Sequence, residues 1–350
     1  MVRILSKLFT NVSVCLQNNF NLGTEKTYTY SFLTEKQHFL YFIGISLNTK
    51  DHLCRKNLKI QIMKIGFIGL GIMGSRMATN LQKASYELIL YNRTQEKAKE
   101  MIENGATWAK TPLELAQKSD LVITMLSTPE VVKEMAIGPK GFFNGMKANA
   151  LWINCSTVNP SFSVEIGRIA HENGFRYLDA PVAGTKGPAE NGELLFFVGG
   201  TEGDLKEAQP LFDVMGKKTL HLGKVGKGAS VKMLVNQLLG QQMAAFAEAL
   251  IMGEAMGIQQ KTVLDVLLST PVVAPVMAAV RPKLENDNYE ANFPLKWLHK
   301  DLHLSSISAY EEGIAAPNLH ATKELFGLAK QHGYGENDFT ALYSFLRRYP

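Results

Sequence analysis

Residues 64–74 read KIGFIGLGIMG, a short apolar run that leads into a G-x-G-x-x-G pattern. The run 64–68 has the length and composition of a buried strand, and the residues that follow predict a helix through Leu81. Glycines at these spacings allow a tight strand-to-helix turn, close approach of a ligand, and close packing of helix on strand. Because such a helix N-terminus attracts phosphate groups, the stretch predicts a dinucleotide-binding βαβ unit. Its expected cofactor contacts are Gly69, Leu70, Gly71, Ile72, Met73 and Gly74.

The kind of dinucleotide depends on the residues that end the second strand, about 20 positions on. An acidic residue there would accept hydrogen bonds from the ribose hydroxyls of NAD, but the chain has Asn92, Arg93 and Thr94. The guanidinium of Arg93 offers a fixed fork of donors suited to a 2′-phosphate. We therefore expect a preference for NADPH, with NAD possible. The alternative is that Arg93 is a solvated loop residue.

Beyond this unit, short β-rich runs alternate with longer helical windows, which is typical of a parallel sheet covered by helices. One of the helices is expected at 204–215, capped by Asp204. The further strands are expected at 88–91, 121–125, 151–155, 177–179 and 194–198. We therefore expect an α/β fold, with a Rossmann-type doubly wound sheet domain at 63–225.

The character of the chain changes after Gly228 to long helical windows without strands. The first, 229–256, rises about 1.5 Å per residue and is long enough to join two domains. We expect an all-helical C-terminal domain at 226–350 that serves substrate binding and oligomerisation. The apolar residues of the long helix exceed what one small helical domain would bury, so a homodimer or homotetramer is expected.

Residues 1–62 show no sustained helical period and precede a natural start at Met63. They contain eight Lys or Arg and three acidic residues, which accounts for the whole net charge of +5 and leaves 29 basic and 29 acidic residues in the remainder. The balanced remainder argues against a nucleic-acid partner. We expect an extension without a folded role, or a mis-assigned start. A transit peptide and an ordered accessory segment are the alternatives.

Composition excludes several other classes. Three scattered cysteines do not make a disulfide framework or a metal cluster and suit a reducing compartment. No stretch approaches the roughly 18 consecutive apolar residues of a transmembrane helix. His299 and His303 are the only histidines at helical spacing, and they lack a third ligand nearby. We expect a cytoplasmic protein with no metal site and no membrane contact.

Three later motifs carry a family resemblance. Residues 179–185 read DAPVAGT, 226–236 read GKGASVKMLVN, and 293–302 read FPLKWLHKDL. Together with the glycine-rich turn, and in this order, they resemble the β-hydroxyacid dehydrogenases, and most closely the glyoxylate and succinic semialdehyde reductases. The resemblance covers essentially all of 63–350. It implies hydride transfer from NADPH to a small carboxylated aldehyde.

Lys232 and Asn236 lie four residues apart, so they share one face of the long helix near its start. Partial burial would lower the pKa of Lys232 and let it protonate the alkoxide that forms as hydride arrives. The resemblance supports this catalytic role. Asn236 can orient Lys232 or hydrogen-bond the substrate. Both residues could instead be solvated helix residues.

The segment 183–185 is the expected site for the substrate carboxylate. The backbone N–H groups of Gly184 and Thr185 would form a small anion nest. Ala183 stands where the family usually has Ser, which removes a hydroxyl contact that Thr185 could replace in part. A structural turn is the alternative.

The resemblance also implies roles for residues elsewhere in the chain. Phe293 and Asp301 complete the substrate side, although Asp301 could be a surface ion-pair partner. Thr157 meets the nicotinamide end, and Lys300 lies near the cofactor. The residues expected to line the cofactor groove at the end of the third strand, unless they belong to the core, are Met125, Leu126 and Ser127.

Other functions remain open at this stage. The nearest is a 3-hydroxyisobutyrate-type dehydrogenase that oxidises a hydroxy acid with either cofactor. A non-catalytic nicotinamide-binding scaffold occurs where family members lose the lysine, and imine reductases usually replace it. The presence of Lys232 and Asn236 argues against both of these classes.

Overall fold

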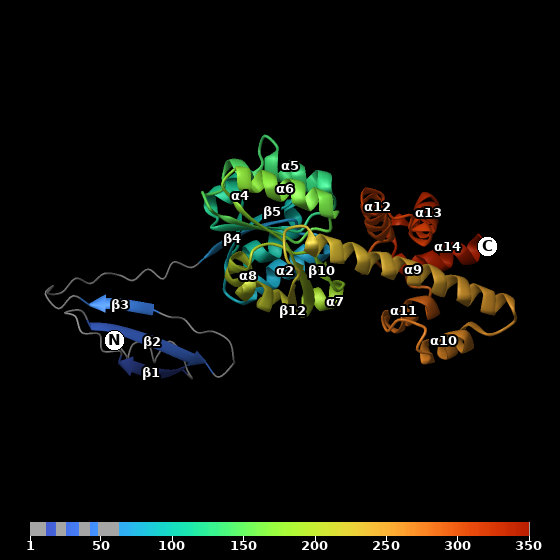
Figure 1. The fold of residues 1–350 in the computed structure, drawn as a ribbon. Coiled ribbons are helices and arrows are strands. Elements are labelled where there is room, and N and C mark those ends of the chain that lie inside the picture. Colours follow the sequence, from blue (N-terminus) through green and yellow to red (C-terminus); the bar gives the residue numbers. More distant parts are fainter. Residues whose placement is uncertain (1–11, 19–25, 35–42, 48–62, 350) are drawn as a thin grey trace. The chain divides into compact units, whose positions relative to one another are not determined.

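The computed structural model describes residues 12–18, 26–34, 43–47 and 63–349 (Figure 1). The chain divides into two compact units, Met1–Gln61 and Ile62–Pro350. The first unit contains three strands that pair antiparallel in the order β1-β2-β3. Their bounds are Val12–Asn18 for β1, Lys26–Thr34 for β2 and Ile43–Leu47 for β3.

The expectation for residues 1–62, an extension without a folded role or a mis-assigned start, stays a prediction. The sequence of β2, KTYTYSFLT, alternates Thr with Tyr, and both residue types have high strand propensity. The expectation rested on the absence of a helical period, which does not exclude strands. The rest of the expected extension lies outside the described residues.

The second unit is built on a six-stranded parallel sheet with the order β6-β5-β4-β7-β8-β9. The strands are β4 (Lys64–Ile68), β5 (Glu87–Tyr91), β6 (Thr107–Trp108), β7 (Leu121–Thr124), β8 (Leu151–Asn154) and β9 (Arg176–Asp179). The chain runs to one edge of the sheet from β4 and to the other from β7. Folds of this kind bind ligands outside the carboxyl ends of the strands at such a switch point. The predicted Rossmann-type sheet is therefore confirmed.

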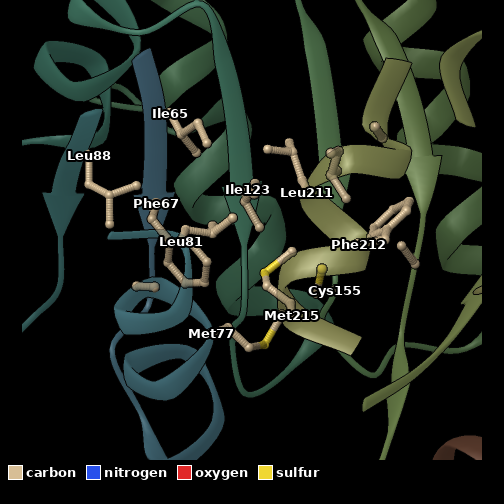
Figure 2. Close-up of a cluster of buried hydrophobic side chains, with 14 of the residues drawn as sticks. Ile65, Phe67, Met77, Leu81, Leu88, Ile123, Cys155, Leu211, Phe212 and Met215 are labelled. Atoms are coloured by element: carbon tan, nitrogen blue, oxygen red, sulfur yellow. The ribbon is translucent and has the colours of Figure 1, made fainter. Parts of the chain in front are cut away.

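Helices cover both faces of this sheet because successive strand residues point to opposite sides. Ile65 and Phe67 of β4 lie in one hydrophobic cluster with Met77 and Leu81 of α2, and this cluster extends past Ile123 to Phe212 of α8 (Figure 2). The other face packs against α4, α5 and α6. The helices are α2 (Ile72–Lys83), α3 (Lys99–Glu103), α4 (Pro112–Lys118), α5 (Pro129–Ile137), α6 (Pro160–Glu172) and α8 (Glu202–Met215).

A smaller three-stranded sheet follows β9. Its order is β10-β11-β12, with β10 (Val182–Ala183) antiparallel and β12 (Gly216–His221) parallel to β11 (Leu194–Val198), and α7 spans Lys186–Glu190. The cap predicted for α8 was wrong. Thr201, not Asp204, is the N-cap, because its Oγ1 accepts a hydrogen bond from the Asp204 N–H at 3.1 Å.

The remainder is helical, as predicted, and begins with α9 (Lys227–Ala255), a single helix of 29 residues. In Figure 1 it runs from the sheet toward the C-terminal helices, which share a hydrophobic core of their own. The proposed domain boundary at 225–226 falls directly before α9. The other helices are α10 (Gln260–Ser269), α11 (Val276–Glu285), α12 (Leu295–Glu311), α13 (Pro317–Gln331) and α14 (Leu342–Arg348).

Two surface properties bear on assembly and membranes. Leu234, Leu238 and Met252 of α9 are each more than half exposed. The expected oligomer stays a prediction, and size-exclusion chromatography with light scattering tests it. Among the described residues, no helix combines the length and the apolar character that crossing a bilayer requires.

Candidate active site

The glycine-rich turn between β4 and α2 has the geometry that a dinucleotide needs. Gly69 has φ +102°, and a Cβ on it would lie 2.3 Å from the Met125 carbonyl oxygen, while a Cβ on Gly74 would lie 2.0 Å from the Gly69 oxygen. A Cβ on Gly71 would meet nothing within 4 Å. Open space therefore lies before the N-terminus of α2, which has no side-chain cap and no acidic residue in its first turn. These features fit a pyrophosphate group.

Asn92, directly after β5, is hydrogen-bonded to this turn. Its Oδ1 accepts a hydrogen bond from the Leu70 N–H at 3.0 Å, and its Nδ2 donates to the Thr94 carbonyl at 2.9 Å. The intervening Arg93 is exposed and makes no ion pair within the described part of the chain. Its guanidinium is therefore free to bind a ligand at the carboxyl ends of the strands.

The groove residues after β7 and β8 are held together by a buried polar network. The Leu126 N–H donates to Ser156 Oγ at 2.9 Å, and the Ser156 N–H donates to Asn154 Oδ1 at 3.1 Å. Thr124 Oγ1 also donates to Asn154 Oδ1, at 2.9 Å. Sequence reasoning did not single out Asn154. A polar residue inside a buried strand was the available signal.

Lys232 is joined to α12 by a chain of contacts. Its Nζ donates to Asn236 Oδ1 at 2.9 Å, and Asn236 Nδ2 donates to Asp301 Oδ2 at 2.6 Å. Lys300 Nζ lies 2.8 Å from Asp301 Oδ1 and donates to the Thr157 carbonyl at 2.8 Å. The structure therefore brings together five residues that the sequence placed at the site, from α9, from α12 and from the loop after β8.

The buried position of Lys232 changes its proton affinity. Its exposure is 7%, and burial lowers the pKa of Lys232 to about 8. The carboxylate of Asp301 opposes this effect, and the charge of Lys300 adds to it. A lysine with a pKa near working pH can donate a proton and regain it during turnover.

The remaining predicted site residues make separate contacts. Gly184 has φ +123°, and a Cβ on it would lie 2.8 Å from a side-chain carbon of Leu194, so this turn requires glycine. Ala183 and Thr185 flank it and are half-buried. Phe293 lies before α12, where its ring packs 6.0 Å from the ring of Phe339. Among the described residues, no three His, Cys, Asp or Glu side chains are grouped to hold a metal ion.

Comparison with known proteins identifies the family. Residues 64–223 match the NAD binding domain of 6-phosphogluconate dehydrogenase, and residues 226–346 match the NAD-binding region of NADP-dependent 3-hydroxyisobutyrate dehydrogenase. The chain belongs to the 3-hydroxyisobutyrate dehydrogenase family. As a member of this family it is an oxidoreductase of the β-hydroxyacid dehydrogenase type with a nicotinamide cofactor.

Individual family members align with most of the chain. Chloroplastic glyoxylate/succinic semialdehyde reductase 2 of Arabidopsis thaliana is 34% identical over 317 residues, 90% of this chain and 88% of the relative. Mitochondrial 3-hydroxyisobutyrate dehydrogenase of Mus musculus is 34% identical over 290 residues, 81% of this chain and 87% of the relative. The 3-hydroxyisobutyrate dehydrogenase of Mycobacterium tuberculosis, solved with L-serine, is 28% identical with a TM-score of 0.75 and covers 82% of this chain and 99% of its own.

Proposed function

We propose that this enzyme reduces a small carboxylated aldehyde, glyoxylate or succinic semialdehyde, to the hydroxy acid with NADPH. The observation that carries the proposal is the buried Lys232, hydrogen-bonded to Asn236, with its pKa lowered to about 8. Two Arabidopsis relatives, each 34% identical, are named for reduction of these two aldehydes. The cytoplasmic location stays a prediction, which cell fractionation tests.

The chain's own residues have distinct tasks in this reaction. The backbone at Gly184 and Thr185 binds the substrate carboxylate, and Thr157 lies at the nicotinamide end. A reduced nicotinamide, when bound, supplies the hydride for the carbonyl carbon. Lys232 Nζ donates its proton to the carbonyl oxygen as negative charge develops there, which yields the alcohol. Asn236 keeps Nζ directed into the site through its 2.9 Å hydrogen bond.

A steady-state panel tests the substrate. We expect the highest kcat/KM with glyoxylate or succinic semialdehyde and NADPH, and a much lower value for oxidation of 3-hydroxyisobutyrate. The relative from Mus musculus makes 3-hydroxyisobutyrate the second candidate substrate. Efficient oxidation of 3-hydroxyisobutyrate together with poor reduction of both aldehydes would reverse the proposal.

The choice of cofactor is tested at Arg93. Replacing Arg93 by Ala removes the guanidinium proposed to bind the 2′-phosphate, and a hydrogen bond to a charged group contributes about 1.5–3 kcal/mol. We therefore expect NADPH to bind about 10- to 100-fold more weakly. The Kd for NADH should change little, since NADH lacks that phosphate. Fluorescence titration measures both constants.

Arg168→Ala is the matched control for this measurement. Arg168 is also an exposed arginine of the sheet domain, but it pairs with Glu172 within α6. Arg168→Ala should leave the Kd values for NADPH and for NADH unchanged. Equal losses of NADPH and NADH affinity in Arg93→Ala would contradict a role in recognising the phosphate.

A further inference from the structure

Asp179 is a buried acid that the proposed reaction does not use. It is the last residue of β9 and is 1% exposed. Its main chain exchanges hydrogen bonds with Gly199, directly after β11, at 3.1 Å and 2.8 Å. Asp179 therefore joins the edge strand of the large sheet to the small sheet, immediately before the segment that contains Gly184.

The side chain of Asp179 caps α9, whose N-cap residue lies 47 positions later in the chain. Its Oδ1 accepts a hydrogen bond from the Gly226 N–H at 2.9 Å, and its Oδ2 accepts one from the Ala229 N–H at 2.8 Å. Gly226 is the N-cap residue of α9, and that helix has no cap from a side chain of its own N-cap residue. The carboxylate from β9 thus satisfies N–H groups that a helix start leaves open.

Two glycines make room for this carboxylate, and a third adopts the backbone conformation that the start of α9 requires. A Cβ on Gly199 would lie 2.4 Å from Asp179 Oδ1, and a Cβ on Gly228 would lie 2.8 Å from Oδ2 and 2.3 Å from the Phe197 carbonyl oxygen. Gly226 has φ +93°, which favours glycine. Side chains at positions 199 and 228 would therefore collide with the carboxylate.

The contact between Asp179 and the start of α9 connects two parts of the proposed site, the substrate-binding turn and the catalytic lysine. The chain runs from Asp179 into the carboxylate-binding segment 183–185. On the other side, Lys232 follows the first residue of α9 by five positions, a rise of about 7.5 Å. We propose that Asp179 is a positioning residue that fixes Lys232 relative to the substrate-binding turn. This inference rests on the proposed function of Lys232.

The charge state of Asp179 agrees with this role at neutral pH. Burial raises its pKa to about 6, and the backbone N–H groups of α9 oppose that rise. The carboxyl is therefore mostly ionised at pH 7.5. A negative charge at the N-terminus of a long helix is stabilised by the helix dipole. The neighbouring titratable group is the phenol of Tyr177, which is buried and neutral at this pH.

The test compares Asp179→Ala and Asp179→Asn with wild type, using NADPH and the aldehyde preferred in the substrate panel. We expect kcat to fall about 10- to 100-fold in Asp179→Ala, since small displacements of a reacting group cost about that much. Asp179→Asn keeps one acceptor oxygen and should lie between Asp179→Ala and wild type. The Kd for NADPH should stay within about twofold. The alkaline limb of the pH profile should move to higher pH, because a loosened α9 exposes Lys232 to water.

Thr111→Ala is the matched control for loss of a helix cap. Thr111 Oγ1 accepts a hydrogen bond from the Glu114 N–H at 3.1 Å at the start of α4. It should lower the melting temperature without changing kcat or the pH profile.

Three results would overturn the inference: an unchanged kcat in Asp179→Ala below its melting temperature, losses of kcat and NADPH binding in proportion to the unfolded fraction, or failure of both variants to fold. Lys232→Ala, measured in parallel, separates the two levels of the argument. If Lys232→Ala stays active, the proposed function fails. If Lys232→Ala is inactive while both Asp179 variants keep wild-type kcat, only the inference about Asp179 fails.

Discussion

Lys232→Ala is expected to lower kcat for aldehyde reduction about 10³-fold, within the range by which general acids contribute to catalysis. The side chain is buried, its Nζ is held by Asn236 Oδ1 at 2.9 Å, and burial lowers its pKa to about 8. No other group in this chain of contacts can take its place, because Lys300 is paired with Asp301 at 2.8 Å. The Kd for NADPH should change less than about threefold, since the proposed cofactor contacts lie elsewhere.

Two variants make this result specific. Lys227→Ala removes an exposed lysine from the first turn of the same helix and should keep wild-type kcat. Lys232→Arg keeps a positive charge but cannot give up its proton, so it should be as inactive as Lys232→Ala. Pre-steady-state and steady-state NADPH oxidation measure both. Retained glyoxylate and succinic semialdehyde reduction in Lys232→Ala would show that another group donates the proton.

Most of the sheet could be predicted because its strands are buried runs. The strand expected at 88–91 is β5, Glu87–Tyr91, and the one expected at 64–68 is β4 without change. Three other strands of the second unit gave no usable signal. β6 and β10 have two residues each, and β12, in the small sheet, contains Lys217 and Lys218 in an exposed stretch. Pairing with neighbouring strands, and not local propensity, makes these segments extended.

The candidate site was predictable where its geometry is local. The four-residue spacing of Lys232 and Asn236 places both on one face of α9, and in the structure the two side chains are hydrogen-bonded. The bond from Asn236 to Asp301 spans 65 residues, and no spacing rule reveals it. The cap that Asp179 provides for α9 is equally remote. Such contacts depend on how α9, α12 and the sheet pack, which the pattern of the sequence does not specify.

Replacing Asp301 by Asn is expected to reduce kcat about 100-fold through Lys232. Asp301 is 2% exposed, and its Oδ2 accepts the Asn236 amide N–H at 2.6 Å, which leaves the amide oxygen directed at Lys232 Nζ. An amide at position 301 no longer imposes this orientation. The substitution also removes the negative charge that raises the pKa of Lys232, while the positive charge of Lys300, which lowers that pKa, remains.

The pH dependence decides between two roles for Asp301. Reduction requires protonated Lys232, so the rate is constant at lower pH and is lost as pH rises through a pKa of about 8. In Asp301→Asn the alkaline limb of the pH profile should move to lower pH. This is opposite to the shift expected for Asp179→Ala. Glu311→Gln on α12, where Glu311 accepts a hydrogen bond from Ser161 at 2.8 Å, should leave it unmoved. If Asp301 instead binds the substrate directly, as the family resemblance implies, KM for the aldehyde should rise while the limb stays in place.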